Sequence, residues 1–111
     1  MLRLAAIPLA GQRVLTIETD YILAAEMAHE IQRSGGIVAG AVPGTWAALA
    51  VIDSGLAIDC AMIDTYSIDA TTTAELDSLR QRGIAIVFVT GFDNWFDEGD
   101  EEDDLSYSAQ A

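Results

Sequence analysis

The sequence predicts a doubly wound α/β domain, in which helices cover both faces of a parallel sheet. Short apolar runs alternate with amphipathic segments along the chain, and the run Ile84–Val89 is rich in β-branched residues. Glycines such as Gly35, Gly55 and Gly83 follow the amphipathic segments. Continuous apolar strands separated by helices of ordinary length call for parallel pairing with right-handed crossovers. A chain of 111 residues is one domain of ordinary size.

The first half of the chain predicts two strands and two helices. Strands are expected at Arg13–Ile17 and Ile37–Val42. Between them, Tyr21–Ser34 carries apolar residues at helical spacing and is followed by two glycines, which predicts a helix. Thr45 is expected to cap the second helix, whose buried stripe would contain Trp46, Leu49 and Ala50.

The second half predicts two further strands, Ile58–Ile63 and Ile84–Val89, around a third helix. Thr72 and Glu75 have capping-box spacing at the start of that helix, and Leu76 and Leu79 follow as its buried stripe. Beyond Gly91 the pattern weakens. Residues 93–96 are expected to start a fourth helix that the acidic run Asp97–Asp104 propagates poorly, because like charges crowd along a helix. Residues 105–108 predict a weak fifth strand, and no fifth helix is expected before Ala111.

The sequence also predicts the domain organisation. We interpret residues 1–11 as a leader and residues 12–111 as one domain with an acidic loop at 93–104. Neither a signal peptide nor a membrane span is predicted, so a cytoplasmic location is expected.

Composition restricts the partners. The net charge is −13, with 18 acidic and five basic residues, which disfavours binding to nucleic acid and to anionic membranes. Cys60 is the single cysteine and is expected to be buried in a reducing compartment.

Polar residues follow three of the predicted strands. Glu18-Thr19-Asp20 comes after the first strand, Asp64 after the third, and Thr90 ends the fourth. The carboxyl ends of parallel strands meet at one edge of a sheet, so two acids and a hydroxyl should converge there. The five basic residues are all arginines, so no lysine can join them.

Simpler interpretations of these residues stay open at this point. Asp64 is also a common kind of polar strand end, and Glu18-Thr19-Asp20 also favours a helix N-terminus through the helix dipole. His29 is expected to be solvated, and no zinc site is expected because the sequence has no second histidine and no useful cysteine. Trp46 and Trp95 are expected to pack and not to bind a ligand. An enzyme or cofactor carrier is poorly supported, because no glycine-rich phosphate loop follows the first strand.

With these features, the sequence resembles a response-regulator receiver domain, the phosphoacceptor module of bacterial two-component systems. The resemblance covers roughly residues 12–92 and rests on the segments Arg13–Tyr21, Ile58–Asp64 and Gly83–Phe92. The last segment is similar to the receiver subgroup whose fourth strand ends in Phe-x-Thr-Gly-aromatic. The resemblance implies the flavodoxin-like receiver fold, here truncated at the C-terminus.

Position by position, the resemblance implies a role for five residues. Asp64 matches the aspartate that accepts the phosphoryl group, and Thr90 matches the switch hydroxyl. Glu18 and Asp64 would hold Mg²⁺, whereas Thr19 stands where the family has its direct metal ligand; Asp20 is a further candidate through a water. Gln110 falls where the family carries its lysine. We therefore expect Mg²⁺ binding to be weak or absent, and phosphoryl transfer to be slow.

The function implied is a stand-alone, atypical receiver in phosphorelay signal transduction. Such a phosphoprotein is not an enzyme; it acts by binding a histidine kinase or another signalling protein. The alternative is a pseudo-receiver, a binding module independent of phosphorylation. Because no fifth helix is expected, part of the apolar face of the first, third and fourth strands should be exposed. Such a patch favours a docked partner or a homodimer.

Overall fold

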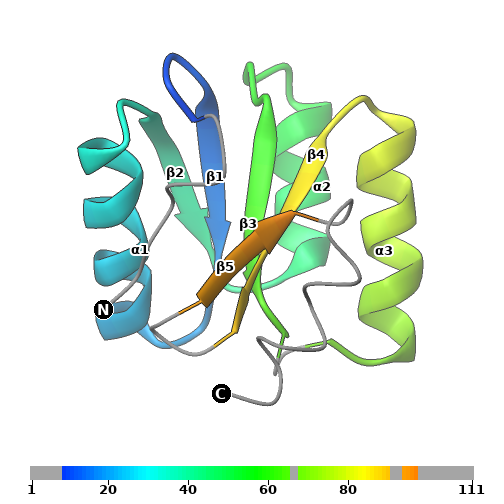
Figure 1. The fold of residues 1–111 in the computed structure, drawn as a ribbon. Helices are drawn as coiled ribbons and strands as arrows, with labels where there is room; N and C mark the ends of the chain where they lie inside the picture. Colours follow the sequence, from blue (N-terminus) through cyan, green and yellow to red (C-terminus); the bar gives the residue numbers. More distant parts are fainter. Residues whose placement is uncertain (1–8, 66–67, 91–93, 98–111) are drawn as a thin grey trace.

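The computed structural model describes residues 9–65, 68–90 and 94–97 (Figure 1). Its sheet has five strands in the order β2-β1-β3-β4-β5. In chain order the elements are β1 (Arg13–Ile17), α1 (Tyr21–Arg33), β2 (Ile37–Val42), α2 (Thr45–Asp53), β3 (Cys60–Asp64), α3 (Ala70–Gln81), β4 (Ala85–Thr90) and β5 (Asn94–Asp97).

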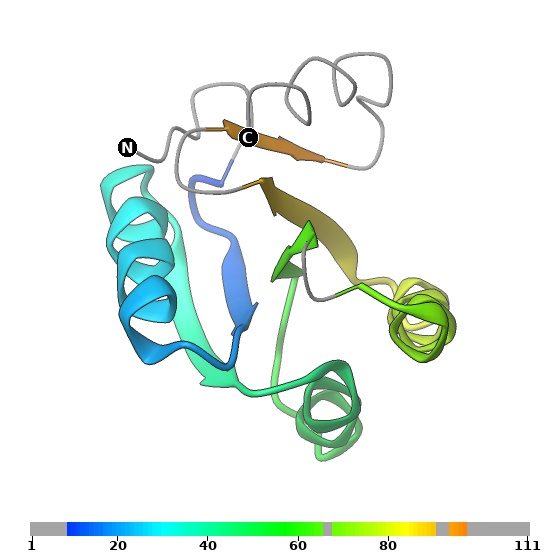
Figure 2. The same cartoon turned by 90° about the horizontal axis from the view of Figure 1, so that it is seen from below.

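The first four strands are parallel, and helices lie on both faces of the sheet. β1 pairs with β2 on one side and with β3 on the other, and β3 pairs with β4. Seen along the strands, α1 covers one face while α2 and α3 cover the opposite face (Figure 2). The predicted doubly wound, flavodoxin-like fold is therefore confirmed. Its strand order reverses between β1 and β3, where folds of this kind place their sites.

Each face of the sheet has its own apolar core. The core under α1 contains Leu9, Val14, Leu23, Met27, Ile31, Cys60, Met62, Val87 and Val89. The core under α2 and α3 contains Leu15, Ile17, Ala48, Ala61, Ile63, Leu76, Leu79, Ile84 and Ile86. Successive residues of β1 and β3 alternate between the two cores, as strand geometry requires. Both central strands are thus buried on both faces, which explains their continuous apolar sequences.

The predicted fourth helix at 93–96 is wrong, because Asn94–Asp97 forms β5. This strand runs antiparallel to β4 and pairs Phe96 with Phe88 and Asn94 with Thr90. Only three residues separate Thr90 from Asn94, which is the length of a hairpin connection. Aromatic residues favour strands, and the acids that follow disfavour a helix. The predicted loop at 93–104 therefore includes a strand. The fifth strand predicted at 105–108 lies outside the described residues.

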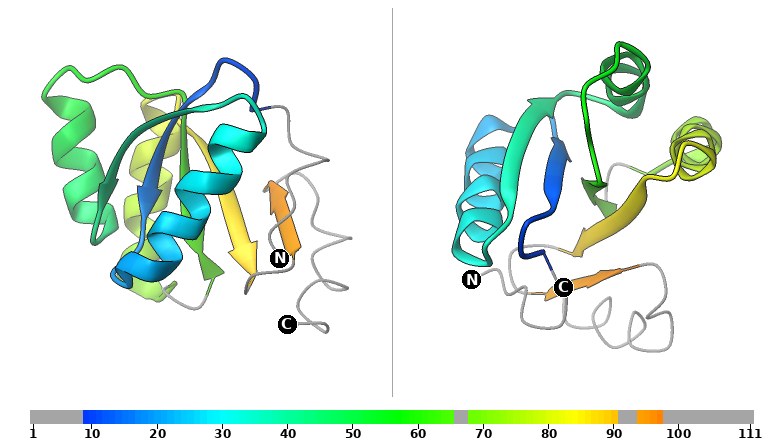
Figure 3. Two further views of the ribbon diagram at one scale, coloured as in Figure 1. Left: turned by 90° about the vertical axis from the view of Figure 1, so that its left-hand side faces the viewer. Right: turned by 90° about the horizontal axis from the view of Figure 1, so that it is seen from above.

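The expected exposed patch on the α1 face is also not observed. Cys60 and Met62 of β3 and Val87 and Val89 of β4 are all buried there. Leu23, Met27 and Ile31 extend from α1 into the same core. β5 lies on the side of the sheet that carries α1 (Figures 2 and 3). The argument for a partner over a bare face therefore fails, whereas the homodimer itself stays a prediction.

Two helices begin differently from expectation. The residue before α2 is Gly44, which makes no side-chain cap, and Thr45 is already helical. Asp69 caps α3, and its Oδ1 accepts from the Thr72 amide at 2.8 Å. The expected stripe of α2 is wrong for Trp46, which is 65% exposed, and for Ala50, which is also exposed, whereas Leu49 packs against the core as expected. Ala48 is buried in this helix as well. None of the helices within the described ranges is long and apolar enough to cross a membrane.

Candidate functional site

Glu18 and Asp64 lie at the carboxyl ends of neighbouring strands. β1 and β3 pair Ile17 with Ile63, so the next residue along each strand is one of these acids. Both residues are half-buried. The sequence-based prediction that the two carboxylates converge is therefore confirmed. They meet between the ends of β1 and β3, which is the point where the strand order reverses.

Glu18 is held in place through one carboxylate oxygen. Its Oε2 accepts from the Asp20 amide at 3.0 Å, and its own amide donates to the Val42 carbonyl at 2.9 Å. Its Oε1 is buried and has no hydrogen-bond partner among the residues that the structure describes. A buried oxygen without a partner loses the hydration that it has in the unfolded chain.

The charge on Glu18 is correspondingly disfavoured. Burial raises the pKa of this carboxyl above its ordinary value, and the nearby charges of Asp64 and Asp20 raise it further. The hydrogen bonds from the backbone of Asp20 and Thr19 act in the opposite sense and lower the pKa. Glu18 and Asp64 are thus close enough to interact. A cation bound between them would offset both the cost of burying the Glu18 charge and the repulsion between the two carboxylates.

The end of β3 is tied to β4. Asp64 pairs with Val89, and the hydroxyl of Thr65 donates to the Val89 carbonyl at 3.2 Å. Thr90 follows Val89 as the last residue of β4, so its backbone lies beside this end of β3. The structure describes only the backbone of Thr90. Gln110 lies outside the described residues, and its assignment stays a prediction.

Asp20 has a structural role at the start of α1. Its Oδ1 accepts from the amides of Ile22 and Leu23, at 2.8 and 3.3 Å, which makes it the N-cap. Asp20 and Thr19 are both exposed. The interpretation that this segment supports the helix N-terminus is confirmed for Asp20. A water-mediated role of Asp20 at a metal is not tested.

The pair Glu18 and Asp64 fits a single cation only in part. The orphaned Oε1 of Glu18 offers a free acceptor next to a second acid. Among the described residues, however, no group of three acidic, histidine or cysteine side chains is placed to hold a metal ion. Mg²⁺ prefers several hard oxygen ligands in octahedral geometry, and two carboxylates leave most positions to water.

Sequence reasoning missed a cavity of about 290 Å³ next to this pair. It lies between the end of β1 and the first turns of α2 and α3, and Glu18, Trp46 and Glu75 are among its lining residues. Inside it, the Thr45 hydroxyl donates a hydrogen bond from Oγ1 to Glu75 Oε1. Thr45 and Glu75 are far apart in the sequence, and each was expected to cap its own helix. Nothing in the sequence therefore predicted that the two side chains would be in contact.

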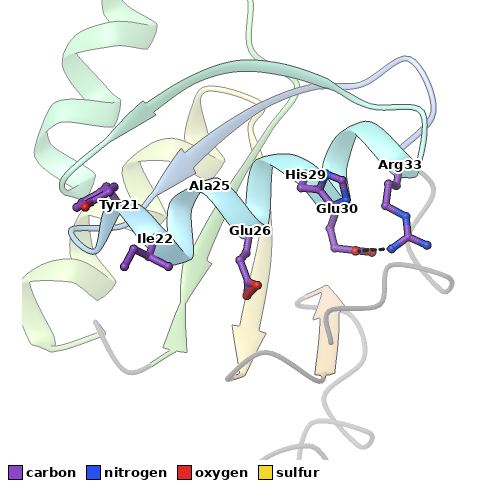
Figure 4. A pocket seen from close by; sticks show the side chains of 7 residues that line it. All are labelled: Tyr21, Ile22, Ala25, Glu26, His29, Glu30 and Arg33. Atoms are coloured by element: carbon purple, nitrogen blue, oxygen red, sulfur yellow. Dashed lines mark hydrogen bonds and ion pairs between the residues drawn. The ribbon is translucent and has the colours of Figure 1, made fainter.

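A second, larger cavity of about 510 Å³ borders the outer side of α1 (Figure 4). Tyr21 and Ile22 are strongly exposed at the start of the helix, whereas His29 lies on the exposed side as expected. Glu30 is buried and pairs with Arg33 at 3.1 Å. All the described lining residues come from this one helix.

Cys60 is buried in the α1 core, as expected. Burial raises the pKa of its thiol to about 11, and the charge of Asp59 adds to this shift. A thiol in that state is a poor nucleophile. The residue therefore acts as a small core side chain.

Comparisons with family models, curated proteins and solved structures find no match to this chain. The functional argument therefore rests on the strand ends themselves, because a doubly wound sheet alone serves many functions.

Proposed function

We propose that this protein is an atypical response-regulator receiver in phosphorelay signalling, with Asp64 as its phosphoacceptor. It acts by binding a histidine kinase or another signalling protein. The observation that carries the proposal is the proximity of the Glu18 and Asp64 carboxylates at the reversal of strand order. Two carboxylates that repel each other favour the binding of a positively charged group, such as a metal ion, between them.

In the proposed reaction, a carboxylate oxygen of Asp64 attacks the phosphorus of a phosphohistidine. A P–O bond forms as the N–P bond breaks, and the electron pair returns to the imidazole nitrogen. The link from Thr65 to Val89 fixes the backbone that carries the nucleophile. Glu18 stands beside it with a free oxygen. Mg²⁺, when bound, would neutralise charge on the phosphoryl oxygens.

The same residues limit the expected rate. Thr19 brings no carboxylate to the metal position, and Asp20 uses Oδ1 to cap α1. The chain has no lysine to place a fixed positive charge on the far side of the phosphoryl group. Loss of one well-placed donor typically costs about 10²–10³ in rate. Slow phosphorylation from a small donor follows.

A second candidate is a pseudo-receiver that binds partners without phosphorylation. The absence of lysine and the exposed Thr19 favour it specifically. In that case Glu18 and Asp64 would be remnants of a metal site, and the signalling surface would lie on the helices. The two candidates differ in whether Asp64 becomes covalently modified.

Intact-mass analysis of the full chain after incubation with acetyl phosphate and Mg²⁺ distinguishes them. We expect a single phosphoryl adduct that forms slowly on the wild type and is absent from Asp64→Asn. The combined change Thr19→Asp and Gln110→Lys should speed labelling by about tenfold or more. Labelling that persists in Asp64→Asn would show that the acceptor is misassigned. No labelling of either the wild type or the combined variant would favour the pseudo-receiver.

A further inference from the structure

The charged residues are divided between the two edges of the sheet. All four described arginines lie at its amino edge, on the first residue of β1 or near the carboxyl ends of α1 and α3. Three of them pair with acids: Arg33 with Glu30, Arg80 with Asp77, and Arg82 with Asp53. The fourth, Arg13, donates from Nε to the Ala57 carbonyl at 2.8 Å. The positive charge of the described chain is therefore already engaged.

The carboxyl edge is acidic and has no arginine among the described residues. The acids there are Glu18, Asp20, Asp64, Asp69 and Glu75. Three of them, Glu18, Asp69 and Glu75, line the cavity of about 290 Å³ between β1, α2 and α3. A concave site that concentrates charge of one sign attracts ligands of the opposite sign.

One wall of this cavity is held in position by a hydrogen bond. Thr45 is only 4% exposed, and its hydroxyl donates to Glu75 across the gap between α2 and α3. This contact fixes the carboxylate of Glu75 before any ligand arrives. A fixed carboxylate loses little conformational entropy when it accepts further hydrogen bonds.

The indole of Trp46 forms the rim. It is 65% exposed, although it lies directly over Gly44: a Cβ built on that glycine would stand 2.7 Å from Nε1 and 2.9 Å from Cδ1 of the ring. The extended backbone at Gly44 would suit any residue. Glycine is therefore needed here because of the close approach of the ring, which leaves no room for a Cβ. An exposed tryptophan beside fixed carboxylates is well suited to a planar cation.

We propose that this cavity binds the guanidinium group of an arginine side chain presented by a partner protein. The guanidinium would stack on Trp46 and donate to Glu75, and its charge would offset that of the acidic edge. Arginine suits the site better than lysine, because its planar fork both stacks on aromatic rings and bonds carboxylates. The inference does not depend on whether Asp64 accepts a phosphoryl group.

The test uses the full chain labelled with ¹⁵N and three small probes. Acetyl-arginine amide is titrated against acetyl-citrulline amide, its neutral isostere, and acetyl-lysine amide, its ammonium counterpart. We expect saturable shifts of the Trp46 indole N–H and of the Thr45 and Thr72 amides with the arginine probe alone. A dissociation constant of about 10 mM or tighter is expected for one isolated side chain.

Variants locate the binding. Glu75→Gln and Trp46→Ala should each weaken binding of the arginine probe by about threefold or more. Glu26→Gln removes the same charge from the exposed side of α1 and should change nothing. Trp46 is exposed, so Trp46→Ala remains informative even if Glu75→Gln disturbs the contact between helices. The proposal is overturned if the citrulline or lysine probe binds equally, if shifts do not saturate, or if Glu26→Gln weakens binding as much as Glu75→Gln does.

Discussion

Glu18 is half-buried near other acids; one of its carboxylate oxygens accepts a hydrogen bond, and the other has no partner within the described part of the chain. The sequence predicted its position at the end of a central strand and its proximity to Asp64. It could not predict the buried Oε1, because the burial of a single atom depends on how segments distant in the sequence pack around the strand end. This residue links stability to function, since the repulsion that destabilises it in isolation is what a cation would relieve.

The first prediction concerns pH and Glu18. Its pKa is raised above 4.5, so the folded state binds this proton more tightly than the unfolded chain does. The resulting stability is present at low pH and is lost as pH rises through the raised pKa. Glu18→Gln should therefore be more stable than the wild type at pH 7.5, by about 0.5–1 kcal/mol after allowing for solvent screening.

Chemical denaturation at several pH values measures this difference. The advantage of Glu18→Gln should vanish below about pH 4, where the wild-type carboxyl is protonated in both states. Glu26→Gln serves as the control, because Glu26 is exposed on α1. A wild type that is more stable than Glu18→Gln at pH 7.5 would show that Oε1 finds a partner in solution.

At the scale of elements, the four parallel strands and the start of α1 were predictable, whereas the starts of α2 and α3 were not. β1 and β2 have the predicted bounds, because their apolar runs are followed by Glu18 and by Pro43. The starts of α2 and α3 differ for separate reasons, a contact across space at α2 and a local cap that sequence reasoning overlooked at α3. Thr45 faces Glu75 instead of its own helix, and Asp69 occupies the cap expected at Thr72. β5 was missed because its pairing with β4 outweighs the weak local pattern.

The cap of α1 gives the second prediction. Asp20→Ala removes the acceptor of the Ile22 and Leu23 amides and should destabilise the protein by about 1 kcal/mol. Asp20→Asn and Asp20→Ser keep an oxygen in place and should recover most of the loss. Thermal unfolding followed by circular dichroism measures all three. Equal losses in the three variants would mean that the charge of Asp20 matters and that its hydrogen bonds do not.

Gly44 gives the third prediction. Gly44→Ala places a methyl group against the Trp46 indole, and the exposed ring can swing away without disturbing the core. Stability should change by less than about 1 kcal/mol, whereas the Trp46 indole resonance should move and the arginine probe should bind more weakly. An unchanged indole resonance would contradict the close contact between Gly44 and Trp46.

The molecule as a whole is electrically asymmetric. Three of the described arginines pair with acids at the amino edge of the sheet, while acidic residues gather at the carboxyl edge around the reversal of strand order. The sequence showed the excess of acid but not its division between edges, which arises only when parallel strands and antiparallel helices bring distant residues together. This arrangement points to partners that carry positive charge, either as a metal ion or as a protein surface.

The most direct test of the acid pair is calorimetric titration of Mg²⁺ into the wild type and single variants at pH 7.5. We expect weak binding, on the order of 1 mM, that is lost in both Glu18→Gln and Asp64→Asn. Asp20→Asn should bind as the wild type does, and Thr19→Asp should bind more tightly because it adds a carboxylate. Undiminished binding in Glu18→Gln or Asp64→Asn would contradict the account, because the ion would then be held elsewhere.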